Sequence, residues 1–214
     1  MKIAPSLLAA DFLHLEKDIL MLNANADFIH LDVMDGSLVP NISFGFSVLE
    51  PLSKIASVPL DAHLMVVEPQ QWFQKIASLG IRMCSFHIEA AGTRTQKFID
   101  DLHALGLKAG VAADPDVPVE KLFKYVGKAD YILLMSVFAG FGGQSFIPES
   151  VGRVVALKQE IERTGASTLI EIDGGVSMKN AALLAESGVD IAVAGSSVFK
   201  AEDPGAMIAS LREA

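Results

Sequence analysis

Short apolar runs with β-strand character alternate with amphipathic helical patterns along the whole chain of 214 residues. The eight β-prone runs are Ile3–Leu7, Asp27–Val33, Pro59–Val66, Met83–Ile88, Lys108–Ala112, Tyr131–Val137, Thr168–Ile172 and Ile191–Ala194. The spacing of apolar residues between them predicts helices over Leu13–Leu22, Phe46–Ile55, Pro69–Leu79, Thr93–Leu105, Pro118–Val126, Ser150–Arg163 and Lys179–Ser187. Strict alternation of this kind implies parallel strands joined by right-handed crossovers. Eight strand–helix units favour a closed (β/α)8 barrel, the TIM barrel of the α/β class, over an open doubly wound sheet.

Glycines mark several predicted junctions between a helix and the next strand. The four that follow a helical pattern and precede a strand are Gly80, Gly106, Gly165 and Gly188. Glycine is favoured directly after a helix because it adopts the left-handed backbone conformation of a C-terminal cap at no steric cost. No linker, low-complexity tract or shift in composition divides the chain, so we expect residues 1–214 to form one barrel domain.

Composition limits the class of protein and its surroundings. Hydrophobic residues make up 51% of the chain, which suits a sheet covered on both faces. The formal net charge of −9 argues against a nucleic-acid partner. No apolar run reaches the roughly 18 residues that a membrane helix needs. Cys84 is the only cysteine, and the first residues do not resemble a signal peptide, so we expect a cytoplasmic protein without disulfides.

Polar residues stand at the ends of three predicted strands. In a barrel of this kind, functional side chains gather at the carboxyl ends of the strands. His30 and Asp32 share one face of the second strand, because side chains alternate along a strand. His63 lies near the end of the third strand, and Asp173 follows the seventh. If these faces point inward, two imidazoles and two carboxylates converge in a set that suits Zn²⁺, Fe²⁺, Mn²⁺ or Co²⁺ without distinguishing among them.

Several of these residues also have a purely structural interpretation. A lone buried histidine in a strand is more often a hydrogen-bonded core residue than a metal ligand. Two histidines and two aspartates at matching strand ends favour a site instead, because an unpaired buried carboxylate is costly. Met34, Met65 and Met135 would ordinarily fill gaps in a core, and only their recurrence at strand ends hints at an apolar wall around the site.

Two further acidic residues are predicted to lie deeper in the barrel. Asp61 and Glu171 fall on the inward face of their strands, one layer below the candidate ligands. We expect them to form ion pairs inside the barrel with Lys108 or Lys2, rather than to take part in catalysis.

A series of glycine-rich segments follows the last three predicted strands. They are Gly140–Gln144, Gly174–Val176 and Gly195–Ser197. Glycine lets backbone N–H groups approach an anion closely, and TIM barrels often bind phosphate with the loops after strands seven and eight. A site of this kind needs no dedicated lysine or arginine, which fits the acidic composition. A phosphorylated small molecule is therefore the predicted ligand.

The motifs resemble those of the ribulose-phosphate 3-epimerase family. The matching segments are Met1–Phe12, His30–Gly45, Asp61–Val66, Phe86–Ala90, Gly140–Pro148 and Glu171–Val176, and together they span essentially the whole chain. The combination of His-x-Asp-x-Met-Asp-Gly, His-Leu-Met and Gly-Phe-Gly-Gly-Gln is highly specific. The resemblance implies an isomerase of the pentose phosphate pathway that interconverts D-ribulose 5-phosphate and D-xylulose 5-phosphate through a cis-enediolate, without a redox cofactor.

The resemblance also implies roles for the site residues. It implies that one divalent metal ion is bound by His30, Asp32, His63 and Asp173. Asp32 and Asp173 also serve as an acid/base pair on opposite faces of the substrate, since a single base would usually restore the original configuration. The implied substrate-binding residues are Ser6, His63, Met34, Met65, Met135, Gly142, Gly143, Gly175, Gly195 and Ser196, the last five of them around the phosphate.

Four places depart from the family pattern without removing a ligand or an acid/base group. They are Phe138-Ala139 in place of Asn-Pro or Glu-Pro, Leu38 in place of Phe, Phe46 in place of Pro, and Ala113-Asp114-Pro115 in place of Leu-Asn-Pro. Loss of the proline frees a backbone torsion, and Phe138 adds bulk where a lid should close over the substrate. The alternative is therefore a 3-epimerase of a hexulose phosphate such as D-allulose 6-phosphate, although Gly142-Gly143 resembles the pentulose-phosphate members.

Other classes of barrel require features that the sequence lacks. The related decarboxylases carry an Asp-x-Lys-x-x-Asp motif that is absent here, and Lys108 begins its strand, at the wrong end for a Schiff-base aldolase. A non-catalytic barrel that binds a sugar phosphate or a metal is the remote alternative. Purified protein that holds no transition metal and shows no metal-dependent activity would favour this alternative.

The family resemblance favours a homo-oligomer.

Overall fold

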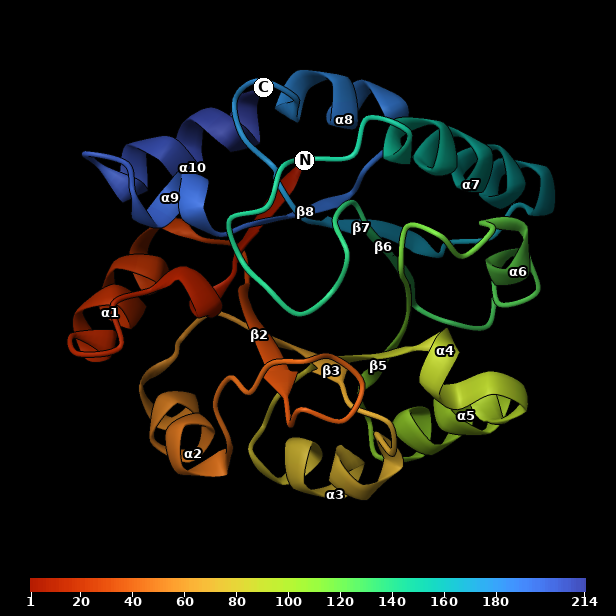
Figure 1. Ribbon diagram of the computed structural model, residues 1–214, viewed down its shortest axis with the longest axis horizontal. Helices are drawn as coiled ribbons and strands as arrows, with labels where there is room; N and C mark the ends of the chain where they lie inside the picture. The colour runs from red at the N-terminus through yellow and green to blue at the C-terminus, as the bar shows by residue number, and fades with distance from the viewer.

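Eight parallel strands form one sheet that curls into a nearly closed barrel (Figure 1). The computed structural model describes residues 1–214. The strands are β1 (Lys2–Pro5), β2 (Ile29–Met34), β3 (Leu60–Met65), β4 (Met83–His87), β5 (Lys108–Ala113), β6 (Tyr131–Met135), β7 (Leu169–Asp173) and β8 (Ile191–Ala194). Their spatial order is β1-β8-β7-β6-β5-β4-β3-β2, and the two ends meet at a parallel bridge between Ser6 and His30. The predicted barrel is confirmed.

Helices surround the barrel and cover its outer face (Figure 1). They are α1 (Leu15–Asn25), α2 (Phe46–Ile55), α3 (Gln70–Ser78), α4 (Ile88–Ala91), α5 (Thr95–Ala104), α6 (Glu120–Phe123), α7 (Ser150–Thr164), α8 (Ala181–Ser187), α9 (Ser196–Phe199) and α10 (Pro204–Glu213), with 3-10 turns at η1 (Leu7–Ala9) and η2 (Gly92–Arg94). No helix has the length and apolar character that a bilayer crossing requires. The prediction for α2 matches its observed bounds.

Two of the three buried apolar clusters reflect the alternation of side chains along each strand. The larger cluster holds 48 buried residues, among them Leu31 and Ile172, and fills the layer between the strands and the helices. The smaller cluster lies on the inner face of the barrel and includes Tyr131, Leu133 and Val193. Because one face of every strand packs outward, the polar residues on the other face are directed into the barrel.

The predicted glycine caps are confirmed. Gly165 and Gly188 end α7 and α8 with φ values of 65° and 103°, in the left-handed region that favours glycine. Gly80 and Gly106 follow the last residues of α3 and α5 with φ values of 75° and 77°. These caps let each helix turn back directly into the next strand.

Some helices differ from the expectation. The pattern over Thr93–Leu105 is divided into η2 and α5, and the pattern over Pro118–Val126 yields only the short helix α6. The helices α4, α9 and α10 were not predicted. The start of α10 has a recognisable signal, because Asp203 accepts a hydrogen bond from the Ala206 N–H while Pro204 occupies the first helical turn.

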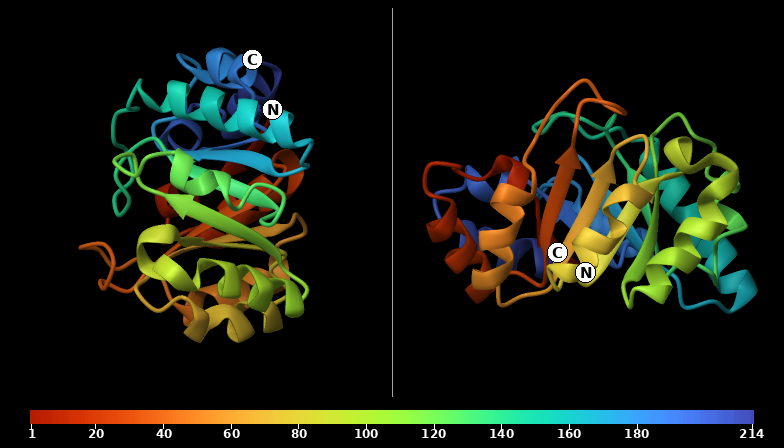
Figure 2. Two further views of the ribbon diagram at one scale, coloured as in Figure 1. Left: turned by 90° about the vertical axis from the view of Figure 1, so that its right-hand side faces the viewer. Right: turned by 90° about the horizontal axis from the view of Figure 1, so that it is seen from below.

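The loops after β2 and β6 rise together above the carboxyl ends of the strands. Figure 2 shows both in its right-hand view, residues 35–45 in orange and residues 136–149 in green to teal. A hydrogen bond of 2.7 Å from Asn41 Nδ2 to the Gly140 carbonyl oxygen joins them. The barrel therefore has one covered mouth, at the end where functional side chains are expected.

Candidate active site

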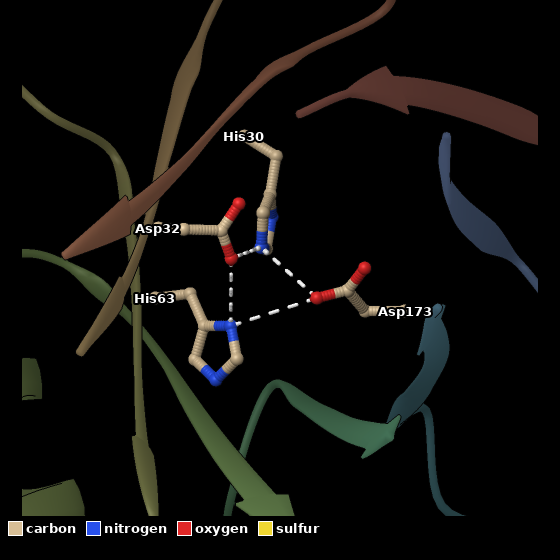
Figure 3. Close-up of side chains that lie close together, drawn as sticks. All are labelled: His30, Asp32, His63 and Asp173. Carbon is tan, nitrogen blue, oxygen red and sulfur yellow. Dashed lines mark ion pairs between the residues drawn. The ribbon is translucent and has the colours of Figure 1, made fainter. Parts of the chain in front are cut away.

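His30, Asp32, His63 and Asp173 converge inside the covered mouth of the barrel (Figure 3). Asp32 Oδ1 lies 3.4 Å from His30 Nε2 and 3.4 Å from His63 Nδ1. Asp173 Oδ2 lies 3.9 Å and 3.8 Å from the same two nitrogens. The four residues predicted from the strand-end pattern therefore meet at one point.

The register of the sheet accounts for this meeting. Asp32 pairs with His63 across the ladder between β2 and β3, so both side chains stand at one level on the inner face. Asp173 ends β7, close to Val193 of β8, and reaches the site from another side of the barrel. His30 and His63 are fully buried and Asp32 is 3% exposed, whereas the Asp173 side chain is 15% exposed. Asp173 is thus the member of the group most accessible from the mouth.

The group fits a divalent transition-metal ion. His30 Nε2 and His63 Nδ1 are buried and have no hydrogen-bond partner among the groups of the protein. Such atoms are costly to bury, and a cation would satisfy both of them. Ligand atoms about 2.0–2.2 Å from a common ion lie roughly 3–4 Å apart, which matches the observed separations. Two imidazoles and two carboxylates also form a donor set that such ions prefer.

The two carboxyl groups of the site have different protonation behaviour. Burial opposes the ionisation of Asp32, but the His30 and His63 imidazoles outweigh it and hold the pKa of Asp32 well below its usual range. Burial, and then the negative charge of Asp32, raise the pKa of Asp173 to about 7. Near neutral pH the chain by itself thus provides one carboxylate and one carboxyl group that can hold a proton.

A second polar layer supports His30 from below. His30 Nδ1 lies 2.7 Å from Asp61 Oδ2, and the Tyr131 hydroxyl donates a 2.8 Å hydrogen bond to Asp61 Oδ1. Both carboxyl oxygens of Glu171 are buried without a hydrogen-bond partner. Burial, and next the Asp61 carboxylate, raise the pKa of Glu171 well above its usual range, which favours its protonated form.

The expectation that Lys108 or Lys2 pairs with these buried acids is wrong. Lys108 Nζ lies 2.8 Å from Asp130 Oδ1 on the surface, and Lys2 Nζ lies 5.5 Å from the centre of the Phe28 ring. Both lysines begin their strands, so their side chains emerge at the amino end of the barrel. Asp61 contacts His30 and Tyr131 instead of a lysine.

The residues predicted to contact the substrate line one pocket above the four-residue site. Its walls include Ser6, Met34, Met65, Met135, Gly142, Gly143, Gly175, Gly195 and Ser196, together with Asp32 and Asp173. The Ser6 hydroxyl also donates a 2.5 Å hydrogen bond to Asp32 Oδ2. His63, which was predicted to contact both the metal and the substrate, lies beneath this wall and is fully buried.

Glycine is required at two positions of the loop that follows β7. Gly174 and Gly175 have φ values of 123° and 64°. A Cβ atom on Gly175 would lie 2.5 Å from the Phe146 backbone nitrogen, and one on Gly174 would lie 2.8 Å from the Val137 nitrogen. No lysine or arginine lines the pocket. An anion there would be held by backbone N–H groups and hydroxyls.

The loop after β6 crosses the top of the pocket. Phe138 and Phe141 both line the pocket, yet they are 52% and 53% exposed. Gln144 Nε2 donates hydrogen bonds to the carbonyl oxygens of Phe138 and Phe141 and braces the loop without a proline. The pocket encloses about 60 Å³.

No role was predicted from the sequence for three residues next to the site. His87 at the end of β4, Glu89 in α4 and Asp114 after β5 bring ligand-type atoms within 4.8 Å of one another. His87 Nε2 also lies 2.9 Å from His63 Nε2. The strand-end rule applied to β4 identifies His87, since it shares the inward face of β4 with Ser85 and Met83.

Comparisons with known proteins agree with the geometry. Residues 2–199 match the sequence model of the ribulose-phosphate 3 epimerase family. The ribulose-phosphate 3-epimerase of Mycobacterium bovis is 41% identical over 210 residues, which cover 98% of this chain and 91% of that protein. The ribulose-phosphate 3-epimerase of Synechocystis sp. is 40% identical over 212 residues, with coverages of 98% and 92%. The solved structure of a 3-hexulose-6-phosphate synthase superposes on this chain with a TM-score of 0.71. The match covers 100% of this chain and 99% of that protein at 15% sequence identity, so it shows a shared fold alone.

Proposed function

The chain belongs to the ribulose-phosphate 3-epimerase family, and on that premise we propose that it interconverts D-ribulose 5-phosphate and D-xylulose 5-phosphate. It is accordingly an isomerase, and its reaction inverts the configuration at C3 of a ketose phosphate. The observation that carries the proposed chemistry is the pair of carboxyl groups, Asp32 and Asp173, which reach one site from different strands and have separated pKa values.

The proton transfers are assigned to these two aspartates. One carboxylate removes the C3 proton on one face of the sugar, and the other carboxyl group delivers a proton to the opposite face. For the reverse reaction the two residues exchange roles. General acid–base catalysis by a positioned side chain contributes typically about 10²–10⁴ in rate.

We assign the binding of one divalent ion, Zn²⁺, Fe²⁺, Mn²⁺ or Co²⁺, to His30, Asp32, His63 and Asp173. When bound, this ion supplies a positive charge that stabilises the negative charge developing beside C3 as the proton leaves. The support is the pair of unpartnered nitrogens on His30 and His63, which a cation would satisfy. The Ser6 hydroxyl holds Asp32 in place by its hydrogen bond to Oδ2.

The remaining pocket residues are assigned to the substrate. Met34, Met65 and Met135 present flexible apolar side chains below the reacting carbons, which keeps water away from the proton-transfer path. The phosphate is assigned to the glycine-rich loops, through Gly142, Gly143, Gly175, Gly195 and Ser196. Backbone donors suit an acidic protein because they add no charge of their own.

The proposal extends to the oligomeric state, the cellular compartment and the domain organisation of the enzyme. We propose a homo-oligomer, because Phe12 and Leu13, just before α1, and Leu20, within α1, expose large apolar side chains. We assign the protein to the cytoplasm as a single domain, since Cys84 is a lone buried thiol and the barrel spans the chain.

The test is epimerisation in D₂O. The metal-loaded protein is incubated with D-ribulose 5-phosphate and, separately, with D-allulose 6-phosphate, and NMR follows the new epimer and the deuterium at C3. We expect conversion of the pentulose phosphate with deuterium in the product and a higher kcat/KM than for the hexulose phosphate. Equal or greater efficiency on the hexulose phosphate would overturn the substrate assignment, and no C3 exchange with either sugar would overturn the reaction.

A further inference from the structure

The segment Phe86–Ala90 is one of the motifs of the sequence, yet the proposed site uses none of its residues. His87 ends β4 and is 1% exposed, directly beside the candidate metal ligand His63. The Nε2 atoms of the two histidines lie 2.9 Å apart, and their rings are nearly parallel, with an angle of 11°. Two nitrogens at that distance form a hydrogen bond only if one of them carries a hydrogen and the other does not.

The position of His63 decides which nitrogen carries the hydrogen. Its Nδ1 faces Asp32 and Asp173 and is the nitrogen available to a cation. With Nδ1 bound to a cation, the hydrogen of the neutral ring sits on Nε2 and is donated to His87 Nε2.

The tautomer of His87 follows from the same argument. Since its Nε2 accepts, its hydrogen sits on Nδ1, which lies 3.4 Å from Glu89 Oε2. A carboxylate can only accept hydrogen bonds, so the Glu89 side chain is placed to accept from this N–H. A continuous chain of donors and acceptors thus runs from His63 through His87 to Glu89.

The outer end of this chain is anchored to the framework. Glu89 Oε1 accepts a 2.7 Å hydrogen bond from the Asp114 N–H, in the segment after β5. Asp114 Oδ1 in turn accepts a 3.1 Å hydrogen bond from the Ala139 N–H in the loop above the pocket. Glu89 is therefore held from a neighbouring strand end.

We infer that His87 and Glu89 are positioning residues that fix the ring orientation and tautomer of His63 and thereby strengthen metal binding. This inference rests on the proposed metal site. Histidine ligands commonly donate their second N–H to a carboxylate or carbonyl, and loss of such a partner costs about 10–100-fold in metal affinity. Here the carboxylate acts through an intervening imidazole, because Glu89 does not reach His63 directly.

Affinity measurements separate positioning from simple packing. The Zn²⁺ dissociation constants of wild type and variants are measured by competition with a chromogenic chelator. We expect His87→Phe, which fills the space but accepts no hydrogen bond, to weaken binding by about 10–100-fold. Glu89→Ala should weaken it in the same direction and leaves the barrel interior intact. His87→Gln, whose amide oxygen accepts from His63 Nε2–H, should recover most of the affinity. The matched control is His103→Phe, a surface histidine whose partner is Asp130.

A spectroscopic readout tests the tautomers directly. In the Zn²⁺-loaded protein, long-range ¹H–¹⁵N NMR should show His63 protonated at Nε2 and His87 protonated at Nδ1 only. Protonation of His87 at Nε2, or wild-type affinity in both His87→Phe and Glu89→Ala, would overturn the inference. Failure of the wild-type protein to bind any of the four candidate metals would instead overturn the metal site itself, so the two failures are distinguishable. Circular dichroism confirms that each variant is folded.

Discussion

At the scale of single residues, the site depends on giving two aspartates different environments. Asp32 receives the Ser6 hydroxyl on one oxygen and faces two imidazoles with the other. Asp173 lies at the strand end, where burial and the neighbouring charge of Asp32 favour its protonated form. The same residue type thus provides a base and an acid in one site, which an epimerase needs.

These pKa shifts predict a pH-dependent metal affinity. A metal binds the ionised form of Asp173, whose pKa is raised to about 7, so a proton competes with the metal below pH 7. Burial opposes a charge on His30, but Asp32 and Asp61 outweigh it and raise its pKa well above the usual range, so a second proton competes there. We expect affinity to rise steeply from pH 5 to 7, by more than about tenfold per pH unit, and less steeply above pH 7. Isothermal titration with Zn²⁺ measures this, and constant affinity from pH 5.5 to 8 would contradict it.

The four central residues could be predicted from sequence because two local rules suffice for them. Alternation places His30 and Asp32 on one face, and the strand-end rule places His63 and Asp173 at the same mouth. The partners of the deeper acids could not be predicted, because they depend on which strands are neighbours. The bond between Asp61 and Tyr131 joins residues 70 positions apart. Asp61 contacts His30 and Tyr131, where a lysine partner was expected.

At the scale of elements, the loop after β7 is the most constrained part of the phosphate region. Gly174 and Gly175 both have positive φ, and both pack against backbone of the segment that follows β6. The short contact between Gly175 and Phe146 ties the phosphate loop to the loop that crosses the pocket. The position of one loop therefore depends on the other.

Gly175→Ala is expected to lower kcat/KM, chiefly by raising KM. The new Cβ would lie 2.5 Å from the Phe146 nitrogen and would sit at a φ of 64°, so the loop must shift. Strain of roughly 1–3 kcal/mol corresponds to a loss of roughly 5- to 150-fold. Steady-state kinetics with D-ribulose 5-phosphate measures the effect. The control is Gly152→Ala in α7, where no heavy atom lies within 4 Å of the new Cβ and activity should not change. Unchanged KM in Gly175→Ala would argue against a phosphate site at this loop.

The strands and most of the longer helices could be predicted better than the short elements, although the ten-residue helix α10 was missed. The glycine caps and the apolar periodicity define α2, α3 and α7 to within a residue or two. The helices α4 and α9 have only four residues each, which is too short for a periodic pattern. The loop after β6 departs from its family pattern at Phe138-Ala139, yet hydrogen bonds from Gln144 and Asn41 brace it, and such contacts are not readable from sequence.

At the scale of the whole molecule, the barrel concentrates acidic groups in a buried centre. Asp32, Asp61, Glu171 and Asp173 all lie within the barrel, and no lysine or arginine joins them. The metal-free protein accommodates them by protonation and by hydrogen bonds to histidine and tyrosine. A cation would reduce this electrostatic cost, so metal binding and stability are coupled.

Metal loading is therefore expected to raise the melting temperature. An ion present at 100 times its dissociation constant adds about 2.7 kcal/mol to the free energy of unfolding. For a chain of this size, that corresponds to roughly 5–10 °C. Differential scanning calorimetry of chelator-treated protein, with and without Zn²⁺ or Mn²⁺, measures the shift. A melting temperature that no candidate metal changes would contradict a site at the barrel centre.

The central claim is that Asp32 and Asp173 together carry the inversion at C3, and Asp173→Asn tests it most directly. Asparagine keeps the size of the side chain and an oxygen that can face a cation, but it neither accepts nor delivers the proton. Turnover of D-ribulose 5-phosphate in D₂O should fall by about 10²–10⁴-fold, while the circular dichroism spectrum stays that of the wild type. Metal content, measured alongside, shows whether the variant still binds its ion. Near-wild-type formation of the deuterated epimer by Asp173→Asn would contradict the two-aspartate account.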